Sequence, residues 1–140
     1  MIRLYENAAK EKNLQLQYRA TVDELVWADP NQYSFMVRNL VYNAIKYSPA
    51  GAIIIISAHH QGATTILSVT DSGEGISKET IEALYGNTPI ETQLGTAGEE
   101  GTGLGLRICL EFAQLNSGRL IIKNNPTGKG TCFILELPHP

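Results

Sequence analysis

The chain has 140 residues, the usual size of a single domain, and 43% of them are hydrophobic, which is enough to form a core. Its 11 Lys and Arg residues against 14 Asp and Glu residues give a formal net charge of −3. This argues against a nucleic-acid binder, because such proteins usually carry a basic surface. No run of about 18 apolar residues occurs, so no segment is predicted to span a membrane and we expect no direct membrane contact.

The N-terminal part predicts one helix and two short strands within a single domain covering residues 1–140. Residues 2–12 have the pattern of a short helix, and residues 14–18 alternate apolar and polar side chains, as a strand does. Leu25 and Trp27 predict a second short strand, with the Trp27 ring in the core.

The segment after residue 28 predicts the longest helix. Asp29 suits the N-cap, Pro30 suits the first helical position, and Gln32 completes a capping-box pattern. Apolar residues then recur every three or four positions, which predicts one face in the core. These residues are Tyr33, Met36, Val37, Leu40, Val41 and Ala44. Residues 49–51, Pro-Ala-Gly, end this region.

The remaining chain predicts a hairpin, two helices and two further strands. The predicted strands are 52–58, 64–70, 119–123 and 131–137, and the predicted helices are 77–84 and 104–115. Strand 52–58 is rich in isoleucine and is expected to be buried on both faces. Residues 85–100 lack apolar periodicity, which predicts a functional or mobile loop. The order of elements favours one α/β domain with helices on one side of a mixed sheet.

A polar stripe is predicted on the longest helix. Residues four and seven apart share a face, so Asn39, Asn43 and Lys46 line up beside the apolar face. The Asn43 carbonyl oxygen suits Mg²⁺, the Lys46 ammonium suits phosphate, and Tyr47 could stack on a base. An exposed helix shoulder with ordinary solvated side chains would have the same pattern.

Two glycine-rich segments follow. Asp71 ends a strand and enters Ser-Gly-Glu-Gly, where Gly73 and Gly75 allow close approach of a flat ligand and the carboxylate could accept from the amino group of adenine. A plain turn is the alternative. Residues 101–105, Gly-Thr-Gly-Leu-Gly, open a helix whose free N–H groups favour phosphate. They match neither the P-loop nor the dinucleotide fingerprint.

Taken together, these segments resemble the ATP-binding catalytic domain of a bacterial two-component sensor histidine kinase, within the gyrase, chaperone, kinase and mismatch-repair ATPase superfamily. Residues 39–46 resemble the N box, 71–76 the first glycine box, 101–106 the second and 128–133 the last. The resemblance implies a two-layer, Bergerat-type α/β sandwich of about three helices on a five-stranded mixed sheet. It also implies ATP and Mg²⁺ as cofactors.

The resemblance also implies residue roles. Asn39 and Lys46 would be catalytic, Asn43 would ligate the metal, and residues 77–100 would form an ATP lid. The positions it assigns to ATP binding are Asn39, Asn43, Lys46, Tyr47, Asp71, Gly73, Gly75, Ile76, Gly101, Thr102, Gly103, Leu104, Gly105 and Thr131. The phenylalanine-centred box of the family is degraded here, since Leu84-Tyr85 stands near its place.

The implied function is donation of the γ-phosphoryl group to a histidine on the dimerisation helices of a parent kinase, for relay to a response regulator. That dimerisation region is not expected within these residues, and the parent is expected to be membrane-anchored with this domain in the cytoplasm. A hydrolytic ATPase switch, an anti-sigma-type serine kinase and a non-catalytic binding module are alternatives. Hydrolytic relatives place a glutamate base where this chain has Asn39, which cannot take a proton.

The three histidines offer no competing site. His59 and His60 end a predicted strand without an acidic or cysteine partner at ligand spacing, so solvated side chains are expected. His139 lies between two prolines and is expected to be disordered. Cys109 and Cys132 are expected to be reduced, buried thiols.

Overall fold

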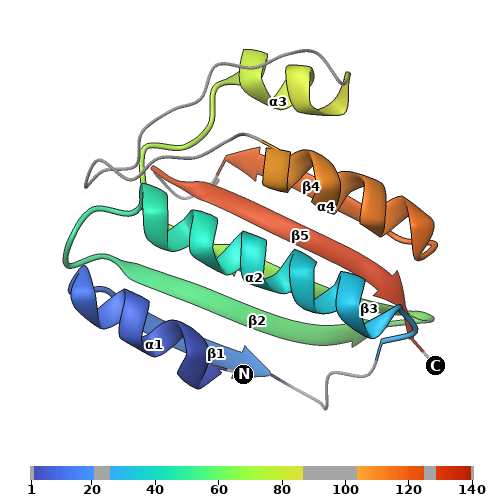
Figure 1. Ribbon diagram of the computed structural model, residues 1–140, viewed down its shortest axis with the longest axis horizontal. Helices are drawn as coiled ribbons and strands as arrows, with labels where there is room; N and C mark the ends of the chain where they lie inside the picture. Colours follow the sequence, from blue (N-terminus) through green and yellow to red (C-terminus); the bar gives the residue numbers. More distant parts are fainter. Residues whose placement is uncertain (1, 21–25, 87–103, 125–128, 140) are drawn as a thin grey trace.

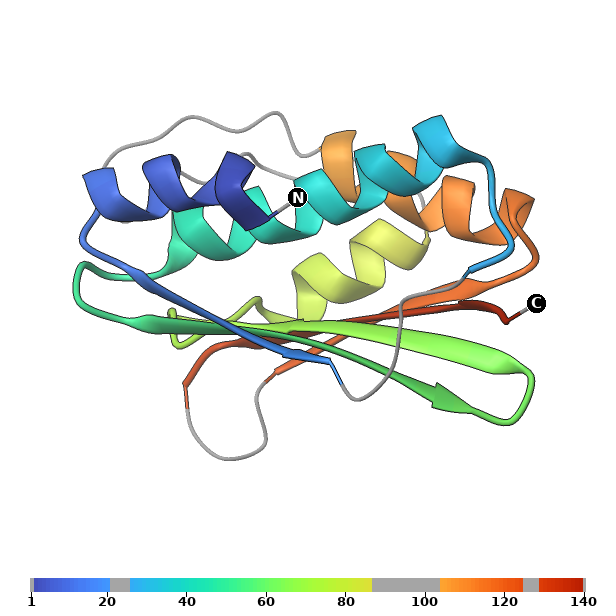
Figure 2. The same ribbon diagram turned by 90° about the horizontal axis from the view of Figure 1, so that it is seen from below.

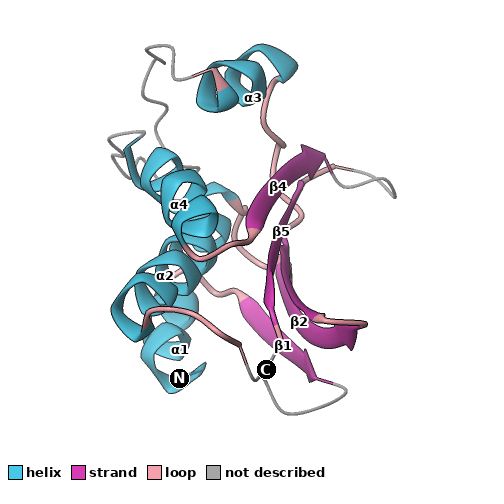
Figure 3. Ribbon diagram, turned by 90° about the vertical axis from the view of Figure 1, so that its right-hand side faces the viewer, coloured by secondary structure: helices cyan, strands magenta, loops and turns pink. Residues whose placement is uncertain are grey.

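A computed structural model describes residues 2–20, 26–86, 104–124 and 129–139. Within these ranges the chain forms two layers, a mixed sheet and a set of helices that all lie on one face of it (Figures 1 and 3). The predicted fold class is therefore confirmed. The four helices expected from the sequence all form, one more than the resemblance implied. None of the helices in the described ranges is long and apolar enough to cross a bilayer.

The sheet has the strand order β1-β2-β3-β5-β4. Its strands are β1 (Gln15–Ala20), β2 (Ile53–Gln61), β3 (Thr64–Thr70), β4 (Arg119–Asn124) and β5 (Thr131–Pro138). β1 runs parallel to β2, and the other neighbours are antiparallel. Because β5 pairs with β3, the beginning of β5 lies beside the end of β3, with Cys132 opposite Thr70. This pairing brings the glycine turn after residue 70 and the last glycine box together.

The helices are α1 (Ile2–Glu11), α2 (Pro30–Tyr47), α3 (Lys78–Tyr85) and α4 (Leu104–Leu115). α2 is the central one, and its fully buried face supplies Met36, Leu40, Val41 and Ala44 to the core, as the periodicity predicted. α1 and α4 lie beside it on the same face of the sheet (Figure 2). Ser77 caps α3, since its Oγ accepts from the Thr80 N–H at 3.1 Å.

The prediction that strand 52–58 is buried on both faces is wrong. In β2, Ile54, Ile56 and Ala58 point into the core, whereas Ile53 is 41% exposed. Helices cover only one face of the sheet, so side chains that alternate along β2 alternate between the core and the open face. Isoleucine on the open face reflects strand propensity rather than burial.

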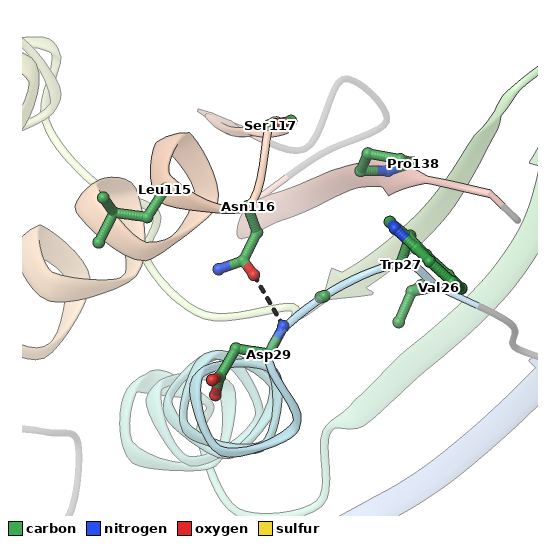
Figure 4. A pocket seen from close by; sticks show the side chains of 8 residues that line it. Val26, Trp27, Asp29, Leu115, Asn116, Ser117 and Pro138 are labelled. Atoms are coloured by element: carbon green, nitrogen blue, oxygen red, sulfur yellow. Dashed lines mark hydrogen bonds between the residues drawn. The ribbon is translucent and has the colours of Figure 1, made fainter.

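The N-terminus of α2 differs in two ways from the prediction. Asp29 caps the helix as expected, because its Oδ1 accepts from the Gln32 N–H at 2.9 Å. The reciprocal capping-box bond is replaced, because the Asp29 N–H donates to Asn116 Oδ1 at 2.8 Å (Figure 4). Gln32 Oε1 instead accepts from Asn116 Nδ2 at 2.7 Å. Trp27 is in no strand and is 71% exposed, so its predicted burial is wrong. Leu25 lies outside the described residues.

Candidate functional site

The polar stripe of α2 forms as predicted, and hydrogen bonds within the helix fix the direction of its amides. Asn43 Nδ2 donates to the Asn39 carbonyl oxygen at 2.9 Å, and Asn39 Nδ2 donates to the Phe35 carbonyl oxygen at 3.1 Å. Each amide nitrogen is therefore engaged by the helix, and no described residue bonds Asn43 Oδ1. A half-buried amide oxygen of this kind is a suitable magnesium ligand.

The first turn of α4 packs directly against this stripe. A Cβ atom built on Gly105 would lie 2.2 Å from Asn39 Oδ1, so a larger residue there would require the Asn39 side chain to move. Leu104, which begins α4, is 59% exposed. The N–H groups of the first turn of a helix attract anions, and the first turn of α4 lies beside Asn39. Gly101, Thr102 and Gly103, which sequence also assigned to phosphate, lie outside the described residues.

Asp71 lies at the end of β3 and is only 2% exposed. Its Oδ1 accepts from the backbone N–H groups of Gly73 at 2.9 Å and Thr131 at 3.1 Å. Burial raises the pKa of this carboxyl group, and the two N–H donors oppose part of that effect. No described residue hydrogen-bonds the second oxygen, Oδ2. Asp71 and Thr131 thus lie together as predicted, and one carboxylate oxygen is left for a ligand.

The last turn of α2 meets the Asp71 turn through Gly73. A Cβ on Gly73 would lie 2.2 Å from the Tyr47 carbonyl oxygen and 3.3 Å from Asp71 Oδ1. The Lys46 ammonium lies 4.8 Å from the centroid of the Tyr47 ring, within cation–π range. α2 therefore links both halves of the site, because Tyr47 contacts the Asp71 turn and Asn39 contacts α4.

Asn124, at the end of β4, is a site residue that the sequence reading missed. Its Oδ1 accepts from the Ile76 N–H at 3.1 Å and lies where a Cβ on Gly75 would come within 2.8 Å. Gly75 also has φ +85°, a conformation that favours glycine. The resemblance assigned Gly73 and Gly75 to making room for the base; the structure adds that they make room for Tyr47 and Asn124. The sequence alone gave no signal that distinguishes Asn124 from any other asparagine before a turn.

Gly130 should be among the least replaceable residues of the site. It has φ +122°, and a Cβ there would lie 2.0 Å from the Asp71 carbonyl oxygen. We expect Gly130→Ala to lower the free energy of unfolding by roughly 2–6 kcal/mol, because backbone strain and steric overlap add. Urea denaturation measures this change.

Gly62→Ala is the matched control for Gly130→Ala. Gly62 has φ +62°, but its Cβ would meet no atom within 4 Å, so only the backbone term applies. That variant should lose about 1–2 kcal/mol. Equal losses in the two variants would contradict the packing of β5 against the Asp71 turn.

The described part of the predicted lid, residues 77–86, is anchored to the sheet. The Tyr85 hydroxyl donates to the Leu120 carbonyl oxygen at 2.8 Å and accepts from the Ile122 N–H at 3.0 Å. Leu84 beside it is buried. The Leu84-Tyr85 pair therefore holds α3 to the edge strand β4. The rest of the predicted lid, from residue 87, lies outside the described residues.

The histidines lie away from this site, as predicted, but two of them are ordered more than expected. His60 Nδ1 and Thr65 Oγ1 are 3.0 Å apart, and the His60 and His139 ring centroids are 3.8 Å apart. The His139 N–H donates to the Ala63 carbonyl oxygen at 2.8 Å, so the predicted disorder of His139 is wrong. No group of three or more His, Cys, Asp or Glu residues suited to a metal occurs in the described ranges.

A hollow of about 550 Å³ lies at the opposite end of α2 (Figure 4). It is lined by Val26, Trp27, Ala28, Asp29, Leu115, Asn116, Ser117 and Pro138. α2 has 18 residues, so its two ends are about 27 Å apart at 1.5 Å per residue. The hollow contains none of the residues predicted to bind nucleotide and no cationic side chain, so it does not suit a triphosphate.

The donors and acceptors at the other end of α2 do fit an adenine nucleotide with magnesium. Asp71 Oδ2 can accept from an amino group, Asn43 Oδ1 can ligate a hard cation, and Lys46 and the first turn of α4 can contact phosphate. These groups come from three elements, and α2 contacts the other two. The structure brings together all the predicted site residues that it describes.

The sequence matches the protein family described as "Histidine kinase-, DNA gyrase B-, and HSP90-like ATPase" over residues 28–140. It is 31% identical over 146 residues to the sensor protein SrrB of Staphylococcus aureus (strain NCTC 8325 / PS 47), covering 95% of this chain and 25% of that protein. The fold is similar to the nucleotide-free catalytic domain of histidine kinase ThkA, with a TM-score of 0.81 and 29% identity, covering 98% of this chain and 86% of that one. ThkA in complex with the response regulator protein TrrA also matches, with a TM-score of 0.74 and 24% identity, covering 99% of this chain and 38% of that one.

Proposed function

The chain belongs to the family of histidine kinase-, DNA gyrase B- and HSP90-like ATPases, as a catalytic domain of the sensor histidine kinase type. From this premise we propose that it binds Mg-ATP at the C-terminal end of α2 and donates the γ-phosphoryl group to a histidine on a partner helix. The observation that carries the proposal is Asp71, a buried carboxylate whose Oδ1 is held by two backbone N–H groups while Oδ2 is left for a ligand.

Asp71 selects the base. A buried carboxylate is costly unless a donor approaches it, and the exocyclic amino group of adenine is such a donor. Guanine presents a carbonyl oxygen at the corresponding ring position, which a carboxylate repels. Thr131 supports the same network from β5 through its backbone N–H, and Gly73 holds the turn against Tyr47. Tyr47 and Ile76, which lie next to this turn, would contact the base.

The groups suited to phosphate extend from the last turn of α2 to the start of α4. Lys46 supplies a cation, and Gly105 with Leu104 presents the first-turn N–H groups of α4; Gly101, Thr102 and Gly103 extend that set along the chain. Asn43 Oδ1 is the proposed protein ligand of Mg²⁺. Held there, Mg²⁺ would supply positive charge that offsets the charge developing during phosphoryl transfer.

Asn39 favours phosphoryl transfer over the alternative of a hydrolytic switch. An amide cannot accept a proton from water, so Asn39 cannot serve as the general base that hydrolysis needs. The Asn39 amide nitrogen donates to Phe35, and its oxygen lies against Gly105, so the side chain is well placed to orient the start of α4. The same argument holds for a serine kinase, in which a serine would accept the phosphoryl group instead of a histidine.

The partners of the whole protein follow from the same proposal. The chain spans a quarter of SrrB, so the parent is expected to supply the dimerisation helices with the acceptor histidine. ThkA has been solved with a response regulator, and we propose a receiver domain of that class as the next acceptor here. We place this domain in the cytoplasm, where ATP is available.

A titration of two proteins in two buffers tests the metal assignment. Asn43→Ala should weaken ATP binding about tenfold in magnesium, the loss expected for one bond to a charged group, and less than about twofold in EDTA. Little structural disturbance is expected, because the only described bond lost is the one from Asn43 Nδ2 to the Asn39 carbonyl oxygen. Isothermal titration calorimetry measures both affinities.

Asn7→Ala is the matched control, because Asn7 is an exposed asparagine on α1. It should bind ATP like the wild type in both buffers. If Asn43→Ala lost the same affinity with and without magnesium, Asn43 would not be the metal ligand. If the wild-type chain failed to bind Mg-ATP, the proposed function itself would be wrong.

A further inference from the structure

Lys12, in the turn that follows α1, contacts the C-terminus of α2. Its Nζ donates to the carbonyl oxygens of Ile45 at 2.9 Å and Lys46 at 2.7 Å. Figures 1 and 2 show the end of α1 beside the end of α2. We infer that Lys12 is a positioning residue for nucleotide binding, acting through the last turn of α2. This inference rests on the proposed function.

The chemistry of a helix end explains the contact. The last carbonyl groups of a helix have no intrahelical N–H partners, and they form the negative end of the helix dipole. α2 ends at Tyr47, and the Ser48 N–H donates to the Ala44 carbonyl oxygen. The ammonium group of Lys12 satisfies two of the following carbonyl groups and places a positive charge at this end.

The turn held by Lys12 is the one that carries the site. It contains Lys46 and Tyr47, and the Tyr47 carbonyl oxygen packs against Gly73 so closely that a Cβ there would come within 2.2 Å. The Gly73 N–H in turn donates to Asp71 Oδ1 at 2.9 Å. A shift of the last turn of α2 would therefore displace both Lys46 and the Asp71 turn, that is, the phosphate end and the base end of the site.

The surroundings of Lys12 are held independently of its side chain. The Gly51 N–H donates to the Asn13 carbonyl oxygen at 2.9 Å, and the Gln15 N–H donates to the Ala52 carbonyl oxygen at 3.1 Å. These backbone bonds tie the turn after α1 to the turn after α2. Loss of the Lys12 ammonium should therefore loosen the end of α2 without unfolding the domain.

Substitutions at two lysines separate this role from a general effect of charge. Lys12→Met keeps most of the side-chain length and loses the ammonium, so its Mg-ATP affinity should fall about 5- to 20-fold. Lys12→Arg keeps the charge and the donors and should restore most of the affinity. Lys10→Met, the same change at an exposed position near the end of α1, should stay within about twofold of the wild type.

A second pair of measurements separates positioning from stability. Ile122→Val, at a buried position of the edge strand β4, lowers stability away from α2 and should keep full ATP affinity. In ¹H–¹⁵N spectra, the amide resonances of Tyr47 and Gly73 should change position in Lys12→Met. They should keep the wild-type chemical shifts in Ile122→Val and Lys10→Met. Should Lys12→Met fold too poorly to titrate, Lys12→Gln, which keeps an amide donor, is used and should lose affinity in the same direction.

The outcomes are distinct. If the wild type binds Mg-ATP, and Lys12→Met binds it equally well with unchanged Tyr47 and Gly73 amide resonances, this role of Lys12 is overturned. The proposed function would then still stand. The role would also be overturned if Ile122→Val weakened ATP binding as much as Lys12→Met does when the two variants have the same free energy of unfolding. A wild-type chain that binds no Mg-ATP would overturn the proposed function, and this role with it.

Discussion

Replacing Asp71 with asparagine should remove most of the nucleotide affinity while leaving the fold intact. The asparagine oxygen can still accept from the Gly73 and Thr131 N–H groups, which are 2.9 and 3.1 Å from Oδ1 in the wild type. Its NH₂ group would then stand where Oδ2 is, facing the amino group of adenine. We expect the affinity for ATP to fall roughly 10- to 100-fold, as for loss of a charged hydrogen bond. The wild type should prefer ATP to GTP by a similar factor, and Asp71→Asn should lose that preference.

The same variant should be at least as stable as the wild type at pH 7. Burial raises the pKa of Asp71 in the folded state, so the unfolded chain releases the proton at lower pH than the folded chain. The penalty for the buried charge is therefore complete above the folded pKa and disappears as the pH falls towards the unfolded value of about 3.9. The difference in free energy of unfolding between Asp71→Asn and the wild type should shrink over that interval.

Asp29→Asn is the matched control for Asp71→Asn. Asp29 caps α2 at the far end, and asparagine caps helices about as well as aspartate. That variant should keep both its ATP affinity and its preference for ATP over GTP. Competition titrations with the two nucleotides decide the matter: similar affinities of wild-type protein for ATP and GTP would contradict the role of Asp71.

Local sequence patterns were sufficient to predict the fold and the family. The three- and four-residue spacing of apolar side chains located α2, and Asp29 marked its first turn. The order of the glycine segments indicated the family, and the family match over residues 28–140 confirms it. These features depend on residues close together in the chain, where spacing determines geometry.

The features that escaped prediction depend on residues far apart in the chain. Asn116 pairs with Asp29 across 87 positions, and Lys12 reaches Ile45 and Lys46 across 33 and 34 positions. Trp27 was placed in the core because large aromatic rings usually lie there, but its side chain is 71% exposed. Spacing along the sequence contains no information about such contacts, so only the folded chain reveals them.

Phosphoryl transfer should depend wholly on a partner helix. The three histidines of the chain are all described, and none lies on a helix. His59 on β2 is paired with Ile66, five residues before Asp71, so it is about 17 Å from the base end of the site along β3. Transfer of this kind requires a well-positioned nucleophile in line with the γ-phosphate. Without a partner, label on the chain should stay at background, and steady hydrolysis should be very slow because Asn39 is no base.

Adding the dimerisation hairpin of the parent kinase should raise the labelling above that of the isolated chain by at least about 100-fold. This is the order of effect that correct positioning of the reacting groups gives. Asn39→Ala should then slow transfer more than it weakens ATP binding, because the amide orients the α4 end of the site. A hairpin with its acceptor histidine replaced by glutamine is the control and should remain unlabelled.

The most direct measurement is therefore incubation of the chain with Mg-ATP labelled in the γ-phosphate, with and without that hairpin, followed by assay for acid-labile phosphohistidine. The account predicts label on the hairpin histidine and none on the chain alone. Acid-labile phosphohistidine on the chain by itself, or rapid ATP hydrolysis without any partner, would contradict it.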